Sequence, residues 1–267
     1  MPSLYAHNKF GKLVLAQLPD EEKAVIEKYP RAFRIGLQGP DYLFFYRAFH
    51  KNKMNQIGIT CHHQDAYKLF QNALEVIEEF GKDSIQYSYL LGMICHLGLD
   101  SICHPYVYEA MELTGCGHCE IEGDFDRLLM SKDGHIPEKY RFDKLVPTDF
   151  DTALGIVYFY DGVSTHQVQS SLRWMKFIKR ILFSPNIVKR SILEFAMRLT
   201  PHYKKYKGHI IRPKENPACC RESEHLYKLL KSAIAPTVQM ISGFNQALKG
   251  FPLPDDFHID FTGKKYI

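Results

Sequence analysis

Residues 90–106, with the sequence LLGMICHLGLDSICHPY, constrain the fold of this chain more than any other stretch. The stretch is mostly apolar, yet His96, Asp100 and His104 recur within it at intervals of four residues. On an α-helix, four residues turn about 400° and rise about 6 Å, so these side chains share nearly one face. A buried helix directs such groups inward only where a cation meets them. Because they span about 12 Å, they suit two or three ions, with the central carboxylate shared.

A second pair of candidate metal ligands, His118 and Glu122, follows at the same spacing of four residues. Such a pair on a helix can chelate a metal that prefers nitrogen and oxygen ligands. A single histidine four residues from an acid is usually an ordinary surface pair. Here five such side chains fall within the 27 residues 96–122, in an apolar context, which indicates a zinc cluster.

The composition is that of a globular protein, with 45% hydrophobic and 24% charged residues. A length of 267 residues allows a substantial core, and we expect one domain that covers residues 1–267. No segment alternates polar and apolar residues over several strands. We therefore predict an all-α fold, a single multi-helix domain built around the buried metal-ligand helix. The formal charge of +4 permits an anionic partner without requiring one, and no stable protein partner is predicted.

The N-terminal residues lack the apolar segment of a signal peptide, and no apolar run reaches transmembrane length. The seven cysteines are an odd number, which favours reduced thiols, so we expect a cytoplasmic protein. Cys116 and Cys119 form a CxxC motif, which is found in redox and structural zinc sites. No second pair has this spacing, because Cys219 and Cys220 are adjacent, and the role of these four cysteines stays open.

An acidic residue, Asp41, follows a Gly-Pro turn and precedes several aromatic residues, among them Tyr42, Phe44 and Phe45. Aspartate is a preferred helix N-cap, so a cap is one interpretation of Asp41. A metal ligand is the other interpretation, and the local sequence leaves both open.

Two histidines, His62 and His63, precede a stretch with helical periodicity that ends at Gly81. We expect them to open this helix, either solvated or with one of them turned toward the interior. The metal-ligand helix is expected over 84–104, with Pro105 ending it. The other expected elements are a helix over 20–29, a loop over 133–148, a helix capped by Thr148 or Asp149, and a long helix over 222–248 bent at Pro236.

The segment 173–207 is rich in Lys and Arg, with Glu194 as its one acidic residue, and aromatic residues are interspersed among the cations. This combination permits peripheral contact with an anionic membrane surface, through Lys179 and Arg180 among others, or with nucleic acid phosphates. The alternative is two amphipathic helices on either side of Pro185 with solvated basic faces.

Five segments, MPSLYAHNKFG, GPDYLFF, IGITCHHQ, YLLGMICHLGLDSICHPY and HCEIE, stand within the first 125 residues. Together they resemble the zinc-dependent phospholipase C family, which is distantly related to the single-strand-specific zinc nucleases. The resemblance implies a mostly helical fold with a zinc cluster in a cleft, and two to three ions are expected here. Position by position, it assigns one ion to Asp41, His62, His96 and Asp100, a second to His104, His118 and Glu122, and a third to His7, Asp100 and the first residue of the chain.

Two features depart from the family pattern. Asp100 and His104 stand slightly closer in sequence than their counterparts do, and the chain begins Met1-Pro2, whereas secreted relatives expose a terminal ligand by cleaving a leader. Removal of Met1 would expose the amine of Pro2 as a ligand for the third ion. An α-amine has a pKa near 8, so zinc can displace its proton at neutral pH.

The resemblance also implies a reaction, the hydrolysis of a phospholipid or of another phosphoester. Two zinc ions about 3.5–4 Å apart activate a water molecule and neutralise charge on the phosphoryl group. Asp41 would orient this water or accept its proton, and Tyr42, Phe44 and Phe45 would contact the substrate. A single-strand-specific nuclease and a non-catalytic helical protein with structural zinc are the alternatives, because the ligands alone do not distinguish the substrates.

Overall fold

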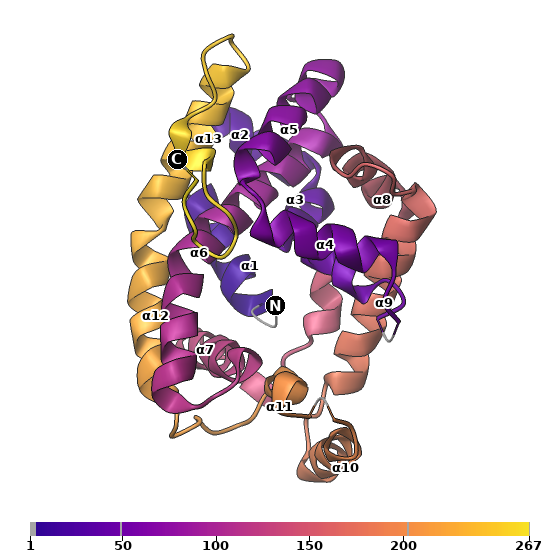
Figure 1. The fold of residues 1–267 in the computed structure, drawn as a ribbon, viewed down its shortest axis with the longest axis vertical. Helices are drawn as coiled ribbons and strands as arrows, with labels where there is room; N and C mark the ends of the chain where they lie inside the picture. The colour runs from indigo at the N-terminus through magenta and orange to yellow at the C-terminus, as the bar shows by residue number, and fades with distance from the viewer. Residues whose placement is uncertain (1–3, 49, 202, 267) are drawn as a thin grey trace.

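Helix α6, Ile85–Thr114, is the element against which most other helices pack (Figure 1). The computed structural model of the protein describes residues 4–48, 50–201 and 203–266, without the side chain of Lys204. Ser84 begins α6, because its hydroxyl oxygen accepts a backbone N–H of the first turn, and Gly115 ends it in the left-handed conformation at φ 68°. The segment 86–100 is buried without interruption, as predicted for a central helix.

The prediction that Pro105 ends this helix is wrong, because α6 continues through Pro105 to Thr114. Proline removes one backbone N–H, which leaves the carbonyl group of Ser101 without its helical donor. The backbone of Gly263 lies against this position: a Cβ atom added to Gly263 would come within 2.5 Å of both Ser101 O and Pro105 Cγ. The C-terminal segment therefore covers the irregular turn of α6.

Helix α3, Pro30–Gly36, crosses α6 with the two backbones in direct contact. A Cβ atom on Gly36 would lie 2.2 Å from the carbonyl oxygen of Tyr89, and one on Gly92 would meet the α3 backbone in the same way. Only glycine allows this close approach. The 3₁₀ helix η1, Gly39–Phe45, follows α3 directly and is thereby held beside α6.

The two histidines predicted to open a helix instead close one. His62 and His63 are the last residues of α4, Lys53–His63. The next helix, α5 (Ala66–Phe80), begins after Asp65, whose side chain accepts a backbone N–H of its first turn. The helix that the histidines were expected to open therefore begins after them, with Asp65 as its N-cap. Of the two expected orientations, His62 is turned inward and His63 is exposed.

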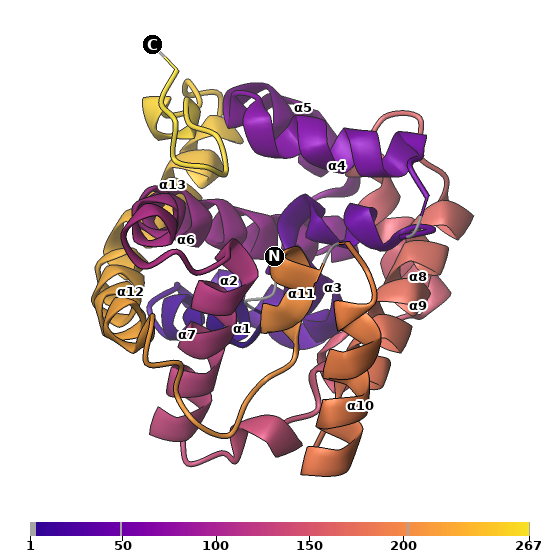
Figure 2. The same ribbon diagram turned by 60° about the horizontal axis from the view of Figure 1, so that its bottom comes forward.

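The expected elements after residue 148 are largely confirmed. Asp149 caps α8, Phe150–Ile156, through its side chain. Helices α9, Thr165–Leu182, and α10, Ile187–Arg198, lie on either side of Pro185. Figure 1 places α10 at the lower end of the molecule, below α9, and in Figure 2, where that end comes forward, α10 is seen beside α9.

The last helical segment differs from the long bent helix expected over 222–248. It consists of α12, Cys220–Ser232, and α13, Ile234–Ala247, with the junction at Ala233. Pro236 lies in the first turn of α13, where a missing N–H costs no helical hydrogen bond. The break therefore falls before the proline and not at it.

The remaining elements follow the expected order, including the helix predicted over 20–29 and a region 133–148 with only short 3₁₀ turns. They are α1 Leu4–Leu15, α2 Asp20–Lys28, α7 His118–Lys132, α11 Tyr203–Tyr206, η2 Pro137–Lys139, η3 Phe142–Leu145, η4 Val157–Phe159, η5 Lys207–His209 and η6 Asp255–Phe257.

The all-α prediction is confirmed, since the described residues form helices and turns, with a single isolated bridge between Ile259 and Lys265. Buried hydrophobic side chains from Leu4 to Phe261 belong to one contiguous cluster. Within the described part of the chain, every helix is too short or too polar to cross a membrane.

Candidate metal centre

Three groups of buried or half-buried side chains bring potential metal-ligand atoms together. Within each group, the ligand atoms lie within 4.8 Å of one another. Atoms that bind one tetrahedral zinc ion at about 2.0–2.1 Å lie about 3.4 Å apart, so each group needs only small adjustments to hold an ion. The groups are His7, His96 and Asp100; Asp41, His62 and His96; and His104, His118 and Glu122.

The group around Asp41 joins side chains from three helical elements, η1, α4 and α6. His62 Nε2, from the last turn of α4, lies 2.7 Å from Asp41 Oδ1. His96 Nε2, from α6, lies 3.8 Å from the same oxygen. Gly39 permits this approach, because at φ 46° a Cβ atom there would lie 2.2 Å from the His96 ring. Asp41 is inside η1 and does not cap it, so the N-cap interpretation is wrong.

The carboxylate of Asp100 lies between three histidines. Its Oδ1 is 3.1 Å from His7 Nε2, and its Oδ2 is 3.2 Å from His96 Nε2 and 3.6 Å from His104 Nδ1. Asp100 forms its group with His7 and His96, and His96 is the member that this group shares with the Asp41 group. The central carboxylate therefore faces ligands on both sides, which is the geometry expected of a shared ligand.

The third group joins α6 to the start of α7. Glu122 Oε1 lies 3.5 Å from His104 Nε2 and 3.2 Å from His118 Nε2. The rings of His104 and His118 are 5.2 Å apart between centroids. His118 is the most accessible of the candidate ligands, since 24% of its side chain is exposed.

Three of these histidines are oriented by backbone carbonyl groups. The Nδ1 atoms lie 2.7 Å from Gly58 O for His62, 3.2 Å from Leu37 O for His96, and 2.5 Å from Phe261 O for His104. A carbonyl oxygen can only accept a hydrogen bond, so each Nδ1 carries the proton. Each Nε2 lies on the side of the carboxylates and would be the ligand atom with an ion bound, which is the arrangement found around histidine ligands of metal ions.

The donor set fits zinc on the evidence of two buried nitrogen atoms. Among the described residues, His96 Nε2 and His7 Nδ1 are buried without a hydrogen-bond partner. The His96 lone pair faces carboxylate oxygens, which are also acceptors, and two acceptors repel unless a cation lies between them. Imidazole nitrogen and carboxylate oxygen are both common zinc ligands.

The pKa values of the two α6 histidines move in opposite directions. Burial lowers the pKa of His96 to about 4. Burial also acts to lower the pKa of His104, but the carboxylates of Asp100 and Glu122 outweigh it and raise the pKa to about 9. Burial opposes ionisation of Asp100, yet the adjacent imidazoles hold the pKa of this carboxyl below its ordinary value. The buried carboxylates therefore stay ionised and need positive charge beside them.

Helix α1 places His7 in the centre through an N-terminal cap from α7. The Asp126 carboxylate accepts the backbone N–H groups of Tyr5 and Ala6, at 3.2 and 2.8 Å. Burial raises the pKa of Asp126 to about 7. Met1 and Pro2, which carry the prediction about the terminal amine, lie outside the described residues.

The aromatic residues after Asp41 differ in their access to the centre. Tyr42 is fully buried and packs edge-on against Tyr160, so its ring has no exposed surface for a substrate. Phe44 is half-buried, and its ring centroid lies 5.2 Å from that of His62. Phe45 is half-buried against the hydrophobic core. Phe44 is therefore the member of this trio that borders the centre.

Phe261, in the C-terminal segment, is a part of the centre that sequence analysis missed. Its fully buried ring lies 5.3 Å from the ring of His62 and 5.4 Å from that of His96, and its carbonyl group holds His104. Asp260 fixes this loop, since its side chain accepts the backbone N–H groups of Thr262 and Lys264. Phe261 is 157 residues from His104 in sequence, and no local motif marks it.

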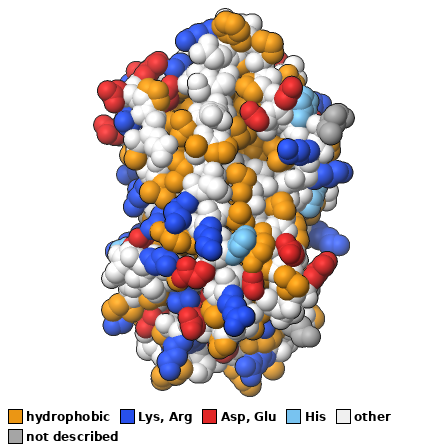
Figure 3. Space-filling model, turned by 90° about the vertical axis from the view of Figure 1, so that its left-hand side faces the viewer, with side chains coloured by type: hydrophobic (Ala, Val, Ile, Leu, Met, Phe, Trp, Pro, Cys, Tyr) orange, Lys and Arg blue, Asp and Glu red, His pale blue; other side chains and the backbone are white. Residues whose placement is uncertain are grey.

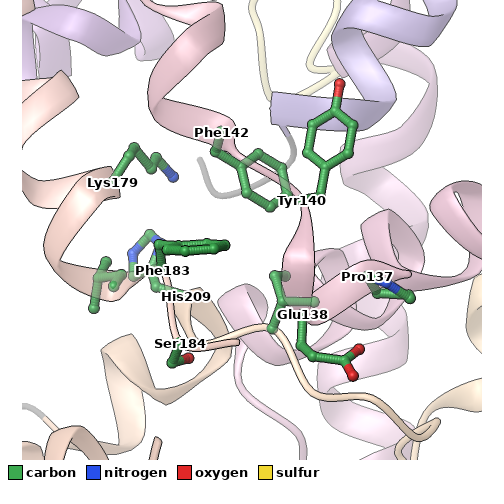
Figure 4. Close-up of a pocket in the computed structure, with 10 residues that line it drawn as sticks. Pro137, Glu138, Tyr140, Phe142, Lys179, Phe183, Ser184 and His209 are labelled. Atoms are coloured by element: carbon green, nitrogen blue, oxygen red, sulfur yellow. The ribbon is translucent and has the colours of Figure 1, made fainter. Parts of the chain in front are cut away.

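The basic side chain Lys179, expected at a lipid surface, is 7% exposed. It lies with His209 on one side of a small pocket, opposite Pro137 and Glu138 (Figure 4). Burial lowers the pKa of Lys179. The expectation that Lys179 contacts a membrane surface is therefore wrong in this structure.

All seven cysteines are free thiols. Cys119 Sγ lies 3.8 Å from His209 Nε2, and Cys116 Sγ lies 3.9 Å from Asn216 Nδ2. Among the described residues, no group with metal-ligand geometry includes a thiol.

The sequence comparisons agree with the geometry. A family model described as zinc dependent phospholipase C matches residues 6–160. No curated protein and no solved structure gives a significant match. The matched range contains all eight candidate ligands from His7 to Glu122, whereas Phe261 and helices α9–α13 lie outside it.

Proposed function

The chain belongs to the zinc dependent phospholipase C family, and on this premise we propose that it hydrolyses phosphoesters with a cluster of two to three zinc ions. The family implies a hydrolase and a phospholipid substrate. The ligands would be His7, Asp41, His62, His96, Asp100, His104, His118 and Glu122.

The observation that carries this proposal is the position of Asp100. Its two carboxylate oxygens face His7 on one side and His96 and His104 on the other, at 3.1 to 3.6 Å. The carboxylates of Asp126 and Asp260, which serve the fold, accept backbone N–H groups, whereas Asp100 faces imidazole nitrogens. The two oxygens of Asp100 face the Nε2 atoms of His7 and His96, which supports the binding of adjacent ions, and adjacent ions are what phosphoester hydrolysis uses.

Zinc bound at these groups supplies Lewis-acid polarisation of the phosphoryl group and lowers the pKa of water toward 7. The remaining roles fall to the side chains of the chain itself. Asp41 accepts the proton of the attacking water or orients that water, because its carboxylate lies between His62 and His96. The carbonyl groups of Gly58, Leu37 and Phe261 keep the imidazole lone pairs directed at the reaction centre.

The substrate approaches from the side of His118, since the other candidate ligands have less than 10% of their side chains exposed. Tyr108 borders this side: it is 41% exposed, and its ring lies 5.9 Å from that of His104 and 5.8 Å from that of His118. An accessible aromatic ring beside the ligands can pack against the alcohol or acyl portion of a phosphoester. Tyr108 and Phe44 are the proposed substrate contacts, with Tyr108 on the open side.

The experiment is hydrolysis of a soluble phosphodiester, p-nitrophenyl phosphocholine, by zinc-loaded protein and by its Asp41→Asn variant. We expect turnover by the native protein and a loss of about 10²-fold or more in kcat in the variant. Turnover of single-stranded DNA without turnover of phosphocholine esters would assign the centre to a nuclease. Zinc binding without turnover of either substrate would assign it to a structural role.

A further inference from the structure

Helix α10 turns its apolar side toward solvent. Val188, Ile192, Phe195 and Leu199 are each 62–74% exposed. At 100° per residue, these four positions fall within an arc of about 60°, so they form one stripe along the helix and its C-cap. We refer to these four residues as the α10 stripe.

The opposite side of α10 faces the protein and is mixed, since the half-buried Leu193 and Met197 lie there beside polar residues. Arg190 is the buried residue of this helix, with 9% exposure. On the same side, Glu194 accepts a hydrogen bond from Arg212 Nη2 at 3.1 Å. A surface helix of a globular protein normally exposes a polar side to solvent, so the exposed apolar stripe of α10 departs from this pattern. A continuous exposed apolar surface of this kind marks a docking site.

The charge around the α10 stripe selects the class of partner. The segment 173–214 contains twelve Lys and Arg residues and one acidic residue, Glu194, which leaves 22 basic and 29 acidic residues in the rest of the chain. The basic residues are thus concentrated in the segment that contains the stripe; Lys179 and Arg190 are buried, whereas Arg180, Arg198 and Lys205 are among the exposed ones. Away from this segment, the face formed by α12 and α13 shows both signs of charge interspersed (Figure 3).

We propose that the α10 stripe inserts into the surface of a bilayer that contains anionic phospholipids, with the surrounding Lys and Arg side chains at the level of the headgroups. An apolar helix face flanked by cations is the combination that binds such surfaces. This inference rests on the proposed function, because a phospholipid substrate is held in a membrane. It assigns α10 to delivery of the enzyme to the substrate, and α6 to the reaction.

The test is co-sedimentation of the full-length protein with vesicles of phosphatidylcholine alone and with about 30% phosphatidylglycerol. The stripe variant is Ile192→Ser, Phe195→Ser and Leu199→Ser; these side chains are exposed, so we expect the variant to fold, which circular dichroism checks. We expect the native protein to bind the anionic vesicles and the stripe variant to bind them at least about tenfold more weakly. The matched control carries Leu113→Ser and Phe251→Ser, two side chains that are 70% and 62% exposed elsewhere, and is expected to bind as the native protein does.

Three results would overturn the proposal. They are equal binding by the native protein and the stripe variant, equal binding to neutral and anionic vesicles, and a concentration-dependent dimer that the stripe substitutions dissolve without any vesicle binding. Hydrolysis of soluble p-nitrophenyl phosphocholine separates this proposal from the proposed function. An active stripe variant that no longer binds vesicles supports docking through α10, whereas a native protein that binds vesicles without hydrolysing the ester refutes the proposed function alone.

Discussion

Helices α6 and α10 place side chains in opposite kinds of unfavourable environment. Helix α6 buries His96, Asp100 and His104 among apolar residues, whereas α10 exposes apolar residues and buries Arg190. In both helices, a partner from outside the chain would suit these groups, a cation for α6 and an apolar phase for α10. The comparison teaches that side chains in an environment of opposite polarity mark a binding site. Buried polar groups indicate a polar or charged ligand, and exposed apolar groups indicate an apolar partner.

The largest effect is expected from Asp100→Asn in α6. Because the carboxylate faces ligands on both sides, its loss should remove more than one zinc ion per chain and lower phosphodiester hydrolysis by about 10³-fold or more. Zinc content by mass spectrometry and kcat measure the two effects. Asp143→Asn is the matched control, since Asp143 is also 4% exposed but pairs with Arg141 outside the centre. Loss of one ion or none in the Asp100 variant would contradict the shared role.

A smaller effect is expected from Asp260→Ala, which acts on α6 at a distance. Asp260 fixes the loop whose Phe261 carbonyl group orients His104, so its removal should weaken zinc binding about 10–100-fold without removing a ligand. Competition with a chelator gives the affinity. The exposed Asp256 in the same tail provides the control Asp256→Ala, which should leave the affinity unchanged. Equal zinc affinity in both variants would show that the loop only covers the centre.

The next effect, on the free energy of unfolding, is expected at the N-terminal cap of α1. Asp126→Ala leaves two buried backbone N–H groups without their acceptor and should lower the free energy of unfolding by about 1–3 kcal/mol. The folded-state pKa of Asp126, about 7, lies above the ordinary 3.8, so the folded protein holds a proton that the unfolded chain releases. The contribution of Asp126 to stability is therefore present below pH 4 and lost as the pH rises through 7.

Asp126→Asn, which cannot ionise, is the control for this pH dependence. Urea denaturation between pH 4 and 8 should show a decline in the native protein relative to the Asn variant. Parallel stability curves for the two proteins would contradict the assigned direction.

The smallest effect is expected from Leu199→Ser in the α10 stripe. This side chain is 74% exposed, so its loss should change the free energy of unfolding by less than about 0.5 kcal/mol. Leu97→Ala in α6, at a fully buried position, should cost about 2–5 kcal/mol. Urea denaturation of both variants gives the two values. A large loss of stability in Leu199→Ser would mean that the stripe is covered by the protein in solution.

The sequence was most informative where helical periodicity carried the signal, whereas single-residue signals such as Pro105 as a helix end and Asp41 as an N-cap misled. The spacing of His96, Asp100 and His104 predicted a central helix with one polar line of side chains, because helical geometry converts a four-residue interval directly into a shared face. His118 and Glu122 were found by the same rule. The expected domain over residues 1–267, the cytoplasmic location and the number of ions remain predictions.

Contacts between distant segments were not predictable in this way. Phe261 reaches His104 across 157 residues, and its position depends on how the C-terminal segment packs over the irregular turn at Pro105. The exposure of the α10 stripe was hidden for a related reason, since an amphipathic pattern does not say which face meets the protein. Sequence periodicity determines which side chains share a face, and tertiary packing determines where that face points.

The most direct test of the account is anomalous diffraction at the zinc absorption edge from crystals of metal-replete protein. We expect two or three zinc peaks, one between Asp41, His62 and His96 and another between His104, His118 and Glu122. A third peak would lie beside His7 and Asp100. The absence of zinc from these groups, or zinc only at the thiols of Cys116 and Cys119, would contradict it.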